Sequence, residues 1–197
     1  MKILIVTGPP CSGKGTQSEI LSKEMNYKHI SIGERCRFEK ENKTEIGLMI
    51  SYYEGKGMLV PDSLMKTLFS KIIEENNSEN GIILDGFPRT IDQVKDLIEL
   101  VKFKKHRISN VINIDVPKEE IIDRGIKRDK ISNKKYNIDF YNRLDKIDEF
   151  EKYTKPALQY MKYIYNVLTI NGVGEIKEVA KNIESGIKEA ISSKNLF

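Results

Sequence analysis

The residues best suited to chemistry follow directly after the first apolar run of the chain. That run, Lys2 to Val6, leads into Gly8-Pro9-Pro10-Cys11-Ser12-Gly13-Lys14-Gly15-Thr16 and then into a helical pattern. Glycines let the backbone curl until successive N–H groups point inward, and the next helix offers its positive end. Lys14 adds a charge that can span two phosphates. The segment predicts a loop that cradles a nucleoside triphosphate, although Gly15 stands where the strict GxxxxGK[ST] pattern has Ser or Thr, and Thr16 comes one place later.

A second candidate is the carboxylate that ends another apolar run. Ile82-Ile83-Leu84-Asp85 has the pattern of a buried strand with an acid at its carboxyl end. There Asp85 would hold magnesium beside the phosphates, through water. A single Asp at a strand end is also an ordinary turn or helix cap, and alone Asp85 would be read that way.

The elements that must position these residues alternate along the chain. Buried strands are predicted at Lys2–Val6, Tyr27–Ile30, Gly81–Leu84, Val111–Ile114 and Val167–Ile170. Helical patterns lie between them, and the clearest is the last, with Ile176, Val179, Ala180, Ile183, Ile187, Ala190 and Ile191 on one face. Alternating strands and helices predict an α/β fold of three layers around a five-stranded parallel sheet, with ligands at the carboxyl ends of the strands.

Two segments leave this alternation. We expect one domain over residues 1–197, with a helical lobe inserted at residues 31–77 and a short, Lys-rich loop at residues 129–137. After that loop a long helix should begin near Asp139. Pro156 should kink or divide it, because proline cannot donate to residue 152.

Composition excludes several classes of protein. The net charge is +4, and the basic residues are interspersed with acids, so no basic stripe predicts a nucleic-acid partner. No apolar run approaches the length of a membrane span, and we expect a cytoplasmic protein. Cys11 and Cys36 lack disulfide or zinc spacing and are expected to be two small buried side chains.

The order of these motifs resembles the nucleoside monophosphate kinases of the adenylate kinase family, over nearly the whole chain. Besides residues 8–17, the resemblance is carried by Ile30-Ser31-Ile32-Gly33-Glu34-Arg35-Cys36-Arg37, Gly57-Met58-Leu59-Val60-Pro61-Asp62, Leu84-Asp85-Gly86-Phe87-Pro88-Arg89-Thr90, Asp123-Arg124 through Arg128, and Thr154-Lys155-Pro156. It implies that a monomeric enzyme transfers a phosphoryl group from ATP, with Mg²⁺, to a nucleoside monophosphate.

The resemblance also implies roles for single residues. ATP would be bound by Pro10, Cys11, Ser12, Gly13, Lys14, Gly15, Thr16, Arg124, Gly172 and Val173, with Arg124 stacked on the adenine. The monophosphate would be bound by Ile32, Arg37, Met58, Leu59, Val60, Gly86, Arg89 and Gln93. In that set Arg37 and Arg89 hold the α-phosphate, and Gln93 reads the base. The catalytic set would be Lys14, Arg89, Arg128, Lys135, Arg143 and Lys146.

The use of arginine favours the same roles. Of the 33 basic residues only seven are arginine, and four of these are Arg37, Arg89, Arg124 and Arg128. Arginine offers a planar fork for phosphate oxygens and a face for stacking, which lysine lacks.

The chain departs from the family pattern at the predicted loop. Counted back from Thr154 without a gap, the two positions that the family fills with arginine carry Lys135 and Lys146, and its paired aspartates are replaced by Asn137 and Ile138. Arg143 and Asp139 would substitute if the register is shifted. The alternative function is therefore a nucleotide-binding paralogue with little catalysis.

The acceptor pocket leaves a second alternative. Ile32 stands where adenylate kinases usually carry Thr, and it resembles the UMP-CMP kinase branch, as does Glu34. Gln93 is instead the residue that reads adenine in adenylate kinases, because its amide donates and accepts at once. We expect AMP as the acceptor, with UMP or CMP as the alternative.

Overall fold

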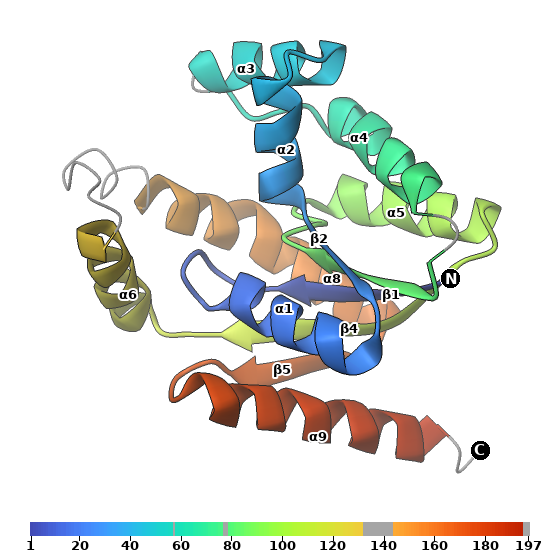
Figure 1. Ribbon diagram of the computed structural model, residues 1–197, viewed down its shortest axis with the longest axis vertical. Helices are drawn as coiled ribbons and strands as arrows, with labels where there is room; N and C mark the ends of the chain where they lie inside the picture. The colour runs from blue at the N-terminus through green and yellow to red at the C-terminus, as the bar shows by residue number, and fades with distance from the viewer. Residues whose placement is uncertain (57, 77–78, 132–143, 195–197) are drawn as a thin grey trace.

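A twisted parallel sheet forms the centre of the molecule (Figure 1). The computed structural model describes residues 1–56, 58–76, 79–131 and 144–194. In these ranges the sheet has five strands in the order β2-β3-β1-β4-β5, and every pairing is parallel. The strands are β1 (Lys2–Thr7), β2 (Lys28–Ser31), β3 (Gly81–Asp85), β4 (Arg107–Asp115) and β5 (Val167–Asn171). The predicted α/β class and five-stranded sheet are confirmed.

Helices cover both faces of the sheet because its side chains alternate between two apolar clusters. In β1, Ile3 and Ile5 belong to one cluster, whereas Leu4 and Val6 belong to the other. The first cluster is covered by α4 (Asp62–Glu75), α5 (Ile91–Phe103) and α8 (Lys155–Ile164), and the second by α1 (Lys14–Met25) and α9 (Ile176–Lys194). This is the three-layer architecture that the sequence predicts.

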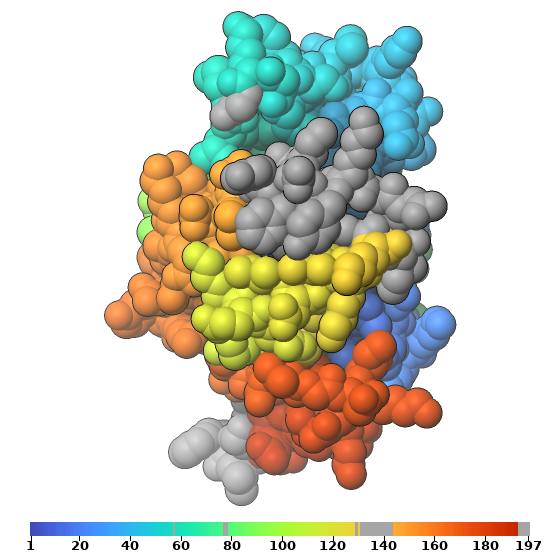
Figure 2. Space-filling view, turned by 90° about the vertical axis from the view of Figure 1, so that its left-hand side faces the viewer, coloured from blue at the N-terminus to red at the C-terminus, as the bar shows by residue number. Residues whose placement is uncertain are grey.

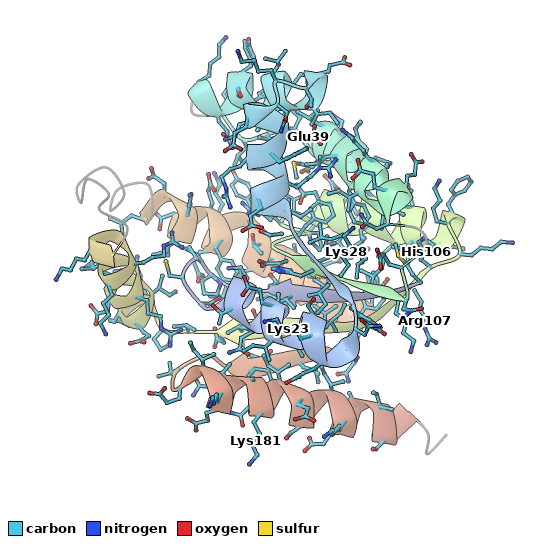
Figure 3. The ribbon with its side chains drawn as sticks, viewed as in Figure 1. Lys23, Lys28, Glu39, His106, Arg107 and Lys181 are labelled. Atoms are coloured by element: carbon cyan, nitrogen blue, oxygen red, sulfur yellow. The ribbon has the colours of Figure 1, made fainter. Side chains whose placement is uncertain are left out.

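The last helix shows where the periodic pattern overestimates burial. Val179, Ile183 and Ile187 of α9 are buried, as expected, but Ile176 and Ile191 at its two ends are more than half exposed. The opposite face carries Lys181, which points away from the sheet (Figure 3).

The segment after β2 rises above the sheet. It consists of α2 (Ile32–Glu41) and α3 (Glu45–Gly55), which Figure 2 shows as the upper projection of the molecule. The next helix, α4, buries six side chains and packs against the sheet. Within the predicted lobe at residues 31–77, α2 and α3 therefore project, and α4 joins them to the core.

The predicted loop and long helix are only partly described. Helix α6 (Lys118–Ile131) continues to residue 131, so a loop that begins at residue 129 is wrong at its first boundary. Residues 132–137 of that loop, and the predicted helix start near Asp139, lie outside the described residues.

The prediction for Pro156 is confirmed. Helical residues 144–149 pass into a π-helical turn, η1 (Phe150–Thr154), and α8 then begins with proline in its first turn. Proline lacks the N–H that the preceding turn would need, so the backbone hydrogen-bond pattern changes at this point.

Candidate active site

The loop between β1 and α1 has the curled backbone that a phosphate cradle needs. Gly8, Cys11 and Gly13 have positive φ angles of 146°, 59° and 92°. A Cβ atom on Gly8 would lie 2.4 Å from the carbonyl oxygen of Ile114, so glycine allows the loop to pack directly on β4. Lys14 arches back and donates from Nζ to the carbonyl of Pro9 at 2.7 Å.

The amino end of α1 differs from the other helix starts of the site. Ser31, Thr44 and Thr90 cap α2, α3 and α5 through side-chain oxygens. Among the described residues, no side chain caps α1, whose N-cap is Gly13 and whose first turn contains no acid. Its free N–H groups and positive dipole end suit an anion from outside the chain.

These groups line a pocket of about 400 Å³. Its walls come from Cys11 and residues 13–16 of the loop, from Asp85 on β3, and from Arg124 and Arg128 on α6. The structure therefore brings most of the predicted ATP-binding and metal residues into one cavity. Cys11 and Cys36 are half-buried free thiols, so the expectation of two buried cysteines is wrong.

The pKa of Lys14 is shifted by charged residues of the predicted site, one of which, Arg89, belongs to the acceptor side. Burial lowers the pKa of Lys14 to about 8, the Asp85 carboxylate partly opposes this, and the positive charges of Arg89 and Arg128 add to it. These three predicted site residues thus lie within electrostatic reach of one amine. An arriving phosphate would relieve the repulsion among the cations.

Asp85 closes the pocket at the carboxyl end of β3. The residue is 8% exposed, and its Oδ2 lies 3.6 Å from His29 Nε2. A Cβ atom on Gly15 would lie 3.7 Å from the same oxygen, so the glycine keeps the space beside the carboxylate open. No cluster of three or more His, Cys, Asp or Glu side chains suited to a metal occurs in the described parts of the chain. One carboxylate fits Mg²⁺ that takes its other ligands from phosphate and water.

Arg124 joins the phosphate loop to the end of β5. Its Nη2 donates to the carbonyl of Gly172 at 2.8 Å, its Nη1 lies 3.5 Å from the carbonyl of Ser12, and its Nε donates to Glu120. Gly172 is buried beside Ile114, and the half-exposed Val173 follows it. The predicted adenine-side residues are therefore neighbours.

Two of the predicted monophosphate residues, Arg37 and Arg89, lie within electrostatic reach of Cys36. Burial raises the pKa of the Cys36 thiol, and the charges of Arg89 and Arg37 oppose that rise, which places both arginines near it. Arg89 Nε also donates to the carbonyl of Gly86 at 2.9 Å. Ile32 is only 2% exposed within the apolar core.

The remaining acceptor residues differ in accessibility. Met58 and Leu59 are about half exposed, Val60 is partly buried against the core, and Gln93 is buried. Lys146 is an exposed residue of the helical segment 144–149. Lys135 and Arg143 lie outside the described residues, so their predicted catalytic roles are not tested.

Sequence reasoning missed a buried carboxylate in the lobe. Glu39 on α2 lies between α2 and α4 (Figure 3) and is completely buried. It accepts hydrogen bonds from Arg35, Thr44 and Lys71, and Arg35 also forms a bidentate pair with Glu75. In the sequence Arg35 had appeared only within the motif of residues 30–37, without a role.

A second missed residue is Asp62, the first residue of α4. Its carboxylate accepts hydrogen bonds from Gln93 Nε2 at 2.7 Å and from Thr90 Oγ1 at 2.9 Å. The residue had appeared in a motif without a role. Its partners lie about thirty positions later in the chain, and nothing in the local pattern indicates that pairing.

The fold and the pocket define a class: a P-loop protein that binds a phosphorylated ligand, with Arg89 within electrostatic reach of its phosphate loop. Comparison with known proteins narrows this class. The sequence model of the family "Adenylate kinase" matches residues 6–166.

Three adenylate kinases are similar to this chain over almost its full length. Adenylate kinases of Leptospira biflexa and Parabacteroides distasonis are 35% and 33% identical, over 95% and 93% of this chain and 100% and 96% of their own. An adenylate kinase of Clostridium kluyveri is 34% identical over 95% of this chain and 98% of its own. The chain belongs to the adenylate kinase family, and it is an ATP-dependent nucleoside monophosphate kinase.

Proposed function

We propose that this enzyme transfers the γ-phosphoryl group of ATP to AMP, with Mg²⁺ as the cofactor. The observation that carries the proposal is the convergence of Asp85, Arg89 and Arg128 on the Lys14 amine. Arg89 belongs to the predicted acceptor site, and Arg128, of the predicted catalytic set, lines the pocket of the phosphate loop, so one cation cluster would serve both phosphates.

Transfer of a phosphoryl group requires alignment and charge neutralisation, with no covalent nucleophile on the protein. The N–H groups at the start of α1 and the Lys14 ammonium would bind the donor phosphates. Arg37 and Arg89 would orient the acceptor phosphate, and Arg128 would neutralise charge on the group in transit. Each such contact is typically worth a few kcal/mol in the transition state.

Magnesium fits beside this cluster. Asp85 would hold the ion through water, next to the space that Gly15 leaves open. When bound, Mg²⁺ supplies charge neutralisation at the phosphate oxygens. Thr16 lines the same pocket, and its hydroxyl oxygen could be a further ligand of the ion.

Water competes with AMP as the acceptor and must be kept out. We propose that the lobe at residues 31–77 and the predicted loop that follows α6 close over the two nucleotides before transfer. The projection of α2 and α3 from the sheet supports a movable lobe.

AMP is the proposed acceptor for two reasons. Gln93 presents an amide beside Arg89, and the relatives at 33–35% identity are named adenylate kinases. The alternatives are UMP or CMP as the acceptor, suggested by Ile32, and a protein that binds nucleotides with little turnover, suggested by Lys135 and Lys146.

A coupled assay with ATP, Mg²⁺ and each of AMP, UMP, CMP and GMP tests the proposal. AMP should give the highest kcat/KM. Arg89→Ala should lower it at least 100-fold, whereas Arg107→Ala, at the amino end of β4 and far from the pocket (Figure 3), should not. No ADP from any monophosphate, or higher activity with UMP or CMP, would contradict it.

Two further proposals concern the molecule in the cell. In the described residues, no helix has both the length and the apolarity needed to cross a membrane. We propose a cytoplasmic enzyme that works as a monomer. Sedimentation at micromolar concentration should give the mass of one chain, 22.7 kDa.

A further inference from the structure

The side chain of Gln93 has an orientation that is defined by hydrogen bonds within the protein. Gln93 is 5% exposed in the first turn of α5. Its Oε1 accepts from the backbone N–H of Arg89 at 2.8 Å, and its Nε2 donates to Asp62 Oδ1 at 2.7 Å.

Chemistry fixes which end of the amide faces which partner. A backbone N–H can only donate, so the atom that faces Arg89 must be oxygen. An ionised carboxylate can only accept, so the atom that faces Asp62 must be the NH₂ group. Two independent partners therefore require the same orientation, and a flipped amide would oppose donor to donor and acceptor to acceptor.

Thr90 orients the Asp62 carboxylate that the Gln93 amide contacts. The Thr90 hydroxyl accepts from the backbone N–H of Gln93 at 3.1 Å, and it donates to Asp62 Oδ2 at 2.9 Å. An ordinary helix cap needs only the bonds within residues 89–93. The two bonds to Asp62 on α4 go beyond what capping α5 requires.

The fixed amide leaves one acceptor site on Oε1 and one N–H on Nε2. Adenine has a complementary edge, with an amino group that donates and N1 that accepts. Hypoxanthine reverses this edge, since its 6-oxygen accepts and its N1–H donates. A site with fixed polarity rejects the reversed edge, because buried polar groups would be left unpaired.

We propose that Asp62 is a positioning residue that sets base specificity by holding the Gln93 amide in the orientation that accepts adenine. The inference rests on the proposed function, in which Gln93 reads the base of the monophosphate. It adds a specificity determinant on α4 that contacts no substrate and acts through Gln93.

Inosine monophosphate is the matched probe, because it differs from AMP only at this edge. The measurement is the ratio of kcat/KM for AMP to that for inosine monophosphate, with binding of each by calorimetry. In Asp62→Ala we expect the ratio to fall about tenfold, through a higher KM for AMP and a lower KM for inosine monophosphate. Asp62→Asn keeps the size of the side chain and should lower the ratio at least threefold. The Asn amide can present its NH₂ group to Gln93, and that group would favour the flipped Gln93 amide.

The control is Asp96→Ala, which removes another polar tie between α4 and α5, the pair of Lys66 and Asp96, and should leave the ratio unchanged. In a Gln93→Ala background, Asp62→Ala should cause no further change in the ratio, since the two residues act as one unit.

The outcomes separate this inference from the function on which it rests. If wild type binds neither monophosphate, or Gln93→Ala leaves the preference intact, the acceptor assignment fails and this inference fails with it. If Gln93→Ala abolishes the preference but both folded Asp62 variants keep the wild-type ratio, this inference alone is overturned. An undiminished effect of Asp62→Ala in the Gln93→Ala background would also overturn it.

Discussion

Burial makes the Lys14 ammonium costly to keep in the folded protein. A pKa lowered by burial from 10.5 to about 8 corresponds to about 3 kcal/mol of disfavoured charge at neutral pH. The hydrogen bond to the Pro9 carbonyl offsets part of this. The Lys14 ammonium thus lowers the stability of the fold but is positioned to bind a phosphate.

Lys14→Met should therefore stabilise the protein while abolishing its activity. We expect kcat to fall at least 100-fold, because one charge on the transferring group is lost. The free energy of unfolding at pH 7 should rise by about 1–3 kcal/mol. Coupled assays and urea unfolding measure the two effects.

The dependence of stability on pH provides a second test of this prediction. Between pH 8 and 10.5 the unfolded chain keeps a proton on Lys14 that the folded chain has released, so wild type gains stability with rising pH. The advantage of Lys14→Met should disappear over that interval. Lys23→Met, on the exposed side of α1 (Figure 3), is the matched control and should change stability by less than about 0.5 kcal/mol. A Lys14→Met protein less stable than wild type at pH 7 would refute the argument.

At the scale of helices, the ionic network around Glu39 holds α2 and α3 to α4. Burial alone would raise the pKa of Glu39, but hydrogen bonds from Thr44, Lys71 and Arg35 outweigh burial and leave that pKa below its usual value. Arg35 likewise lowers the pKa of Glu75 through its bidentate pair. Each carboxylate therefore stabilises the fold above its unfolded pKa, and this contribution is lost as pH falls through the folded pKa.

Arg35→Ala leaves Glu39 buried with one cation fewer. We expect a loss of about 3 kcal/mol at pH 7. The acid limb of the stability curve should move to higher pH, because the pKa of Glu39 rises. Lys66→Ala, which breaks an exposed pair between α4 and α5, should cost less than about 1 kcal/mol. Chemical denaturation from pH 3 to 8 tests both, and equal losses in the two variants would show that burial of Glu39 is unimportant.

The contact between α2 and α3 provides a second test at this scale. A Cβ atom on Gly47 would lie 2.0 Å from the backbone carbonyl oxygen of Glu39, which cannot move aside as a side chain could. Gly47→Ala should cost about 2 kcal/mol or more. Gly55→Ala, on the same helix with open space around it, should be neutral or stabilising by up to about 1 kcal/mol. Thermal unfolding of the pair distinguishes packing from helix propensity, and similar melting temperatures would contradict the close approach.

The strands were predictable because each is a short apolar run between turn residues. The exception is β4, which begins at Arg107 rather than Val111 because β1 also pairs with Arg107, Ile108 and Asn110, before the apolar run. The phosphate loop was predictable for a related reason, since its function resides in consecutive residues.

The partners of Arg35 and Asp62 were not predictable. Arg35 pairs with Glu75 forty positions away, and Asp62 with Gln93 thirty-one positions away. Such contacts arise only when the packing of α4 brings distant segments together. A local pattern could nominate Gln93 as polar and useful, but it could not indicate which way its amide faces.

For the whole molecule, closure of the lobe is the testable consequence. A bisubstrate mimic, in which two adenosines are joined by a polyphosphate chain, should bind both sites at once. We expect a smaller radius of gyration by X-ray scattering and stronger hydrogen-exchange protection in α2 and α3. ATP alone should protect chiefly the phosphate loop and α1. Tight binding of the mimic with unchanged scattering and exchange would exclude closure.

Strand β2 occupies the outer edge of the sheet and is four residues long. It has one neighbour, β3, whereas β1, which carries the phosphate loop, lies between two. The phosphate loop is therefore anchored to a strand that is paired on both sides. The lobe of α2 and α3 follows β2 at the margin of the sheet, where a swing of the backbone would disturb a single short ladder. We therefore expect this lobe, and not the phosphate loop, to move in the proposed closure.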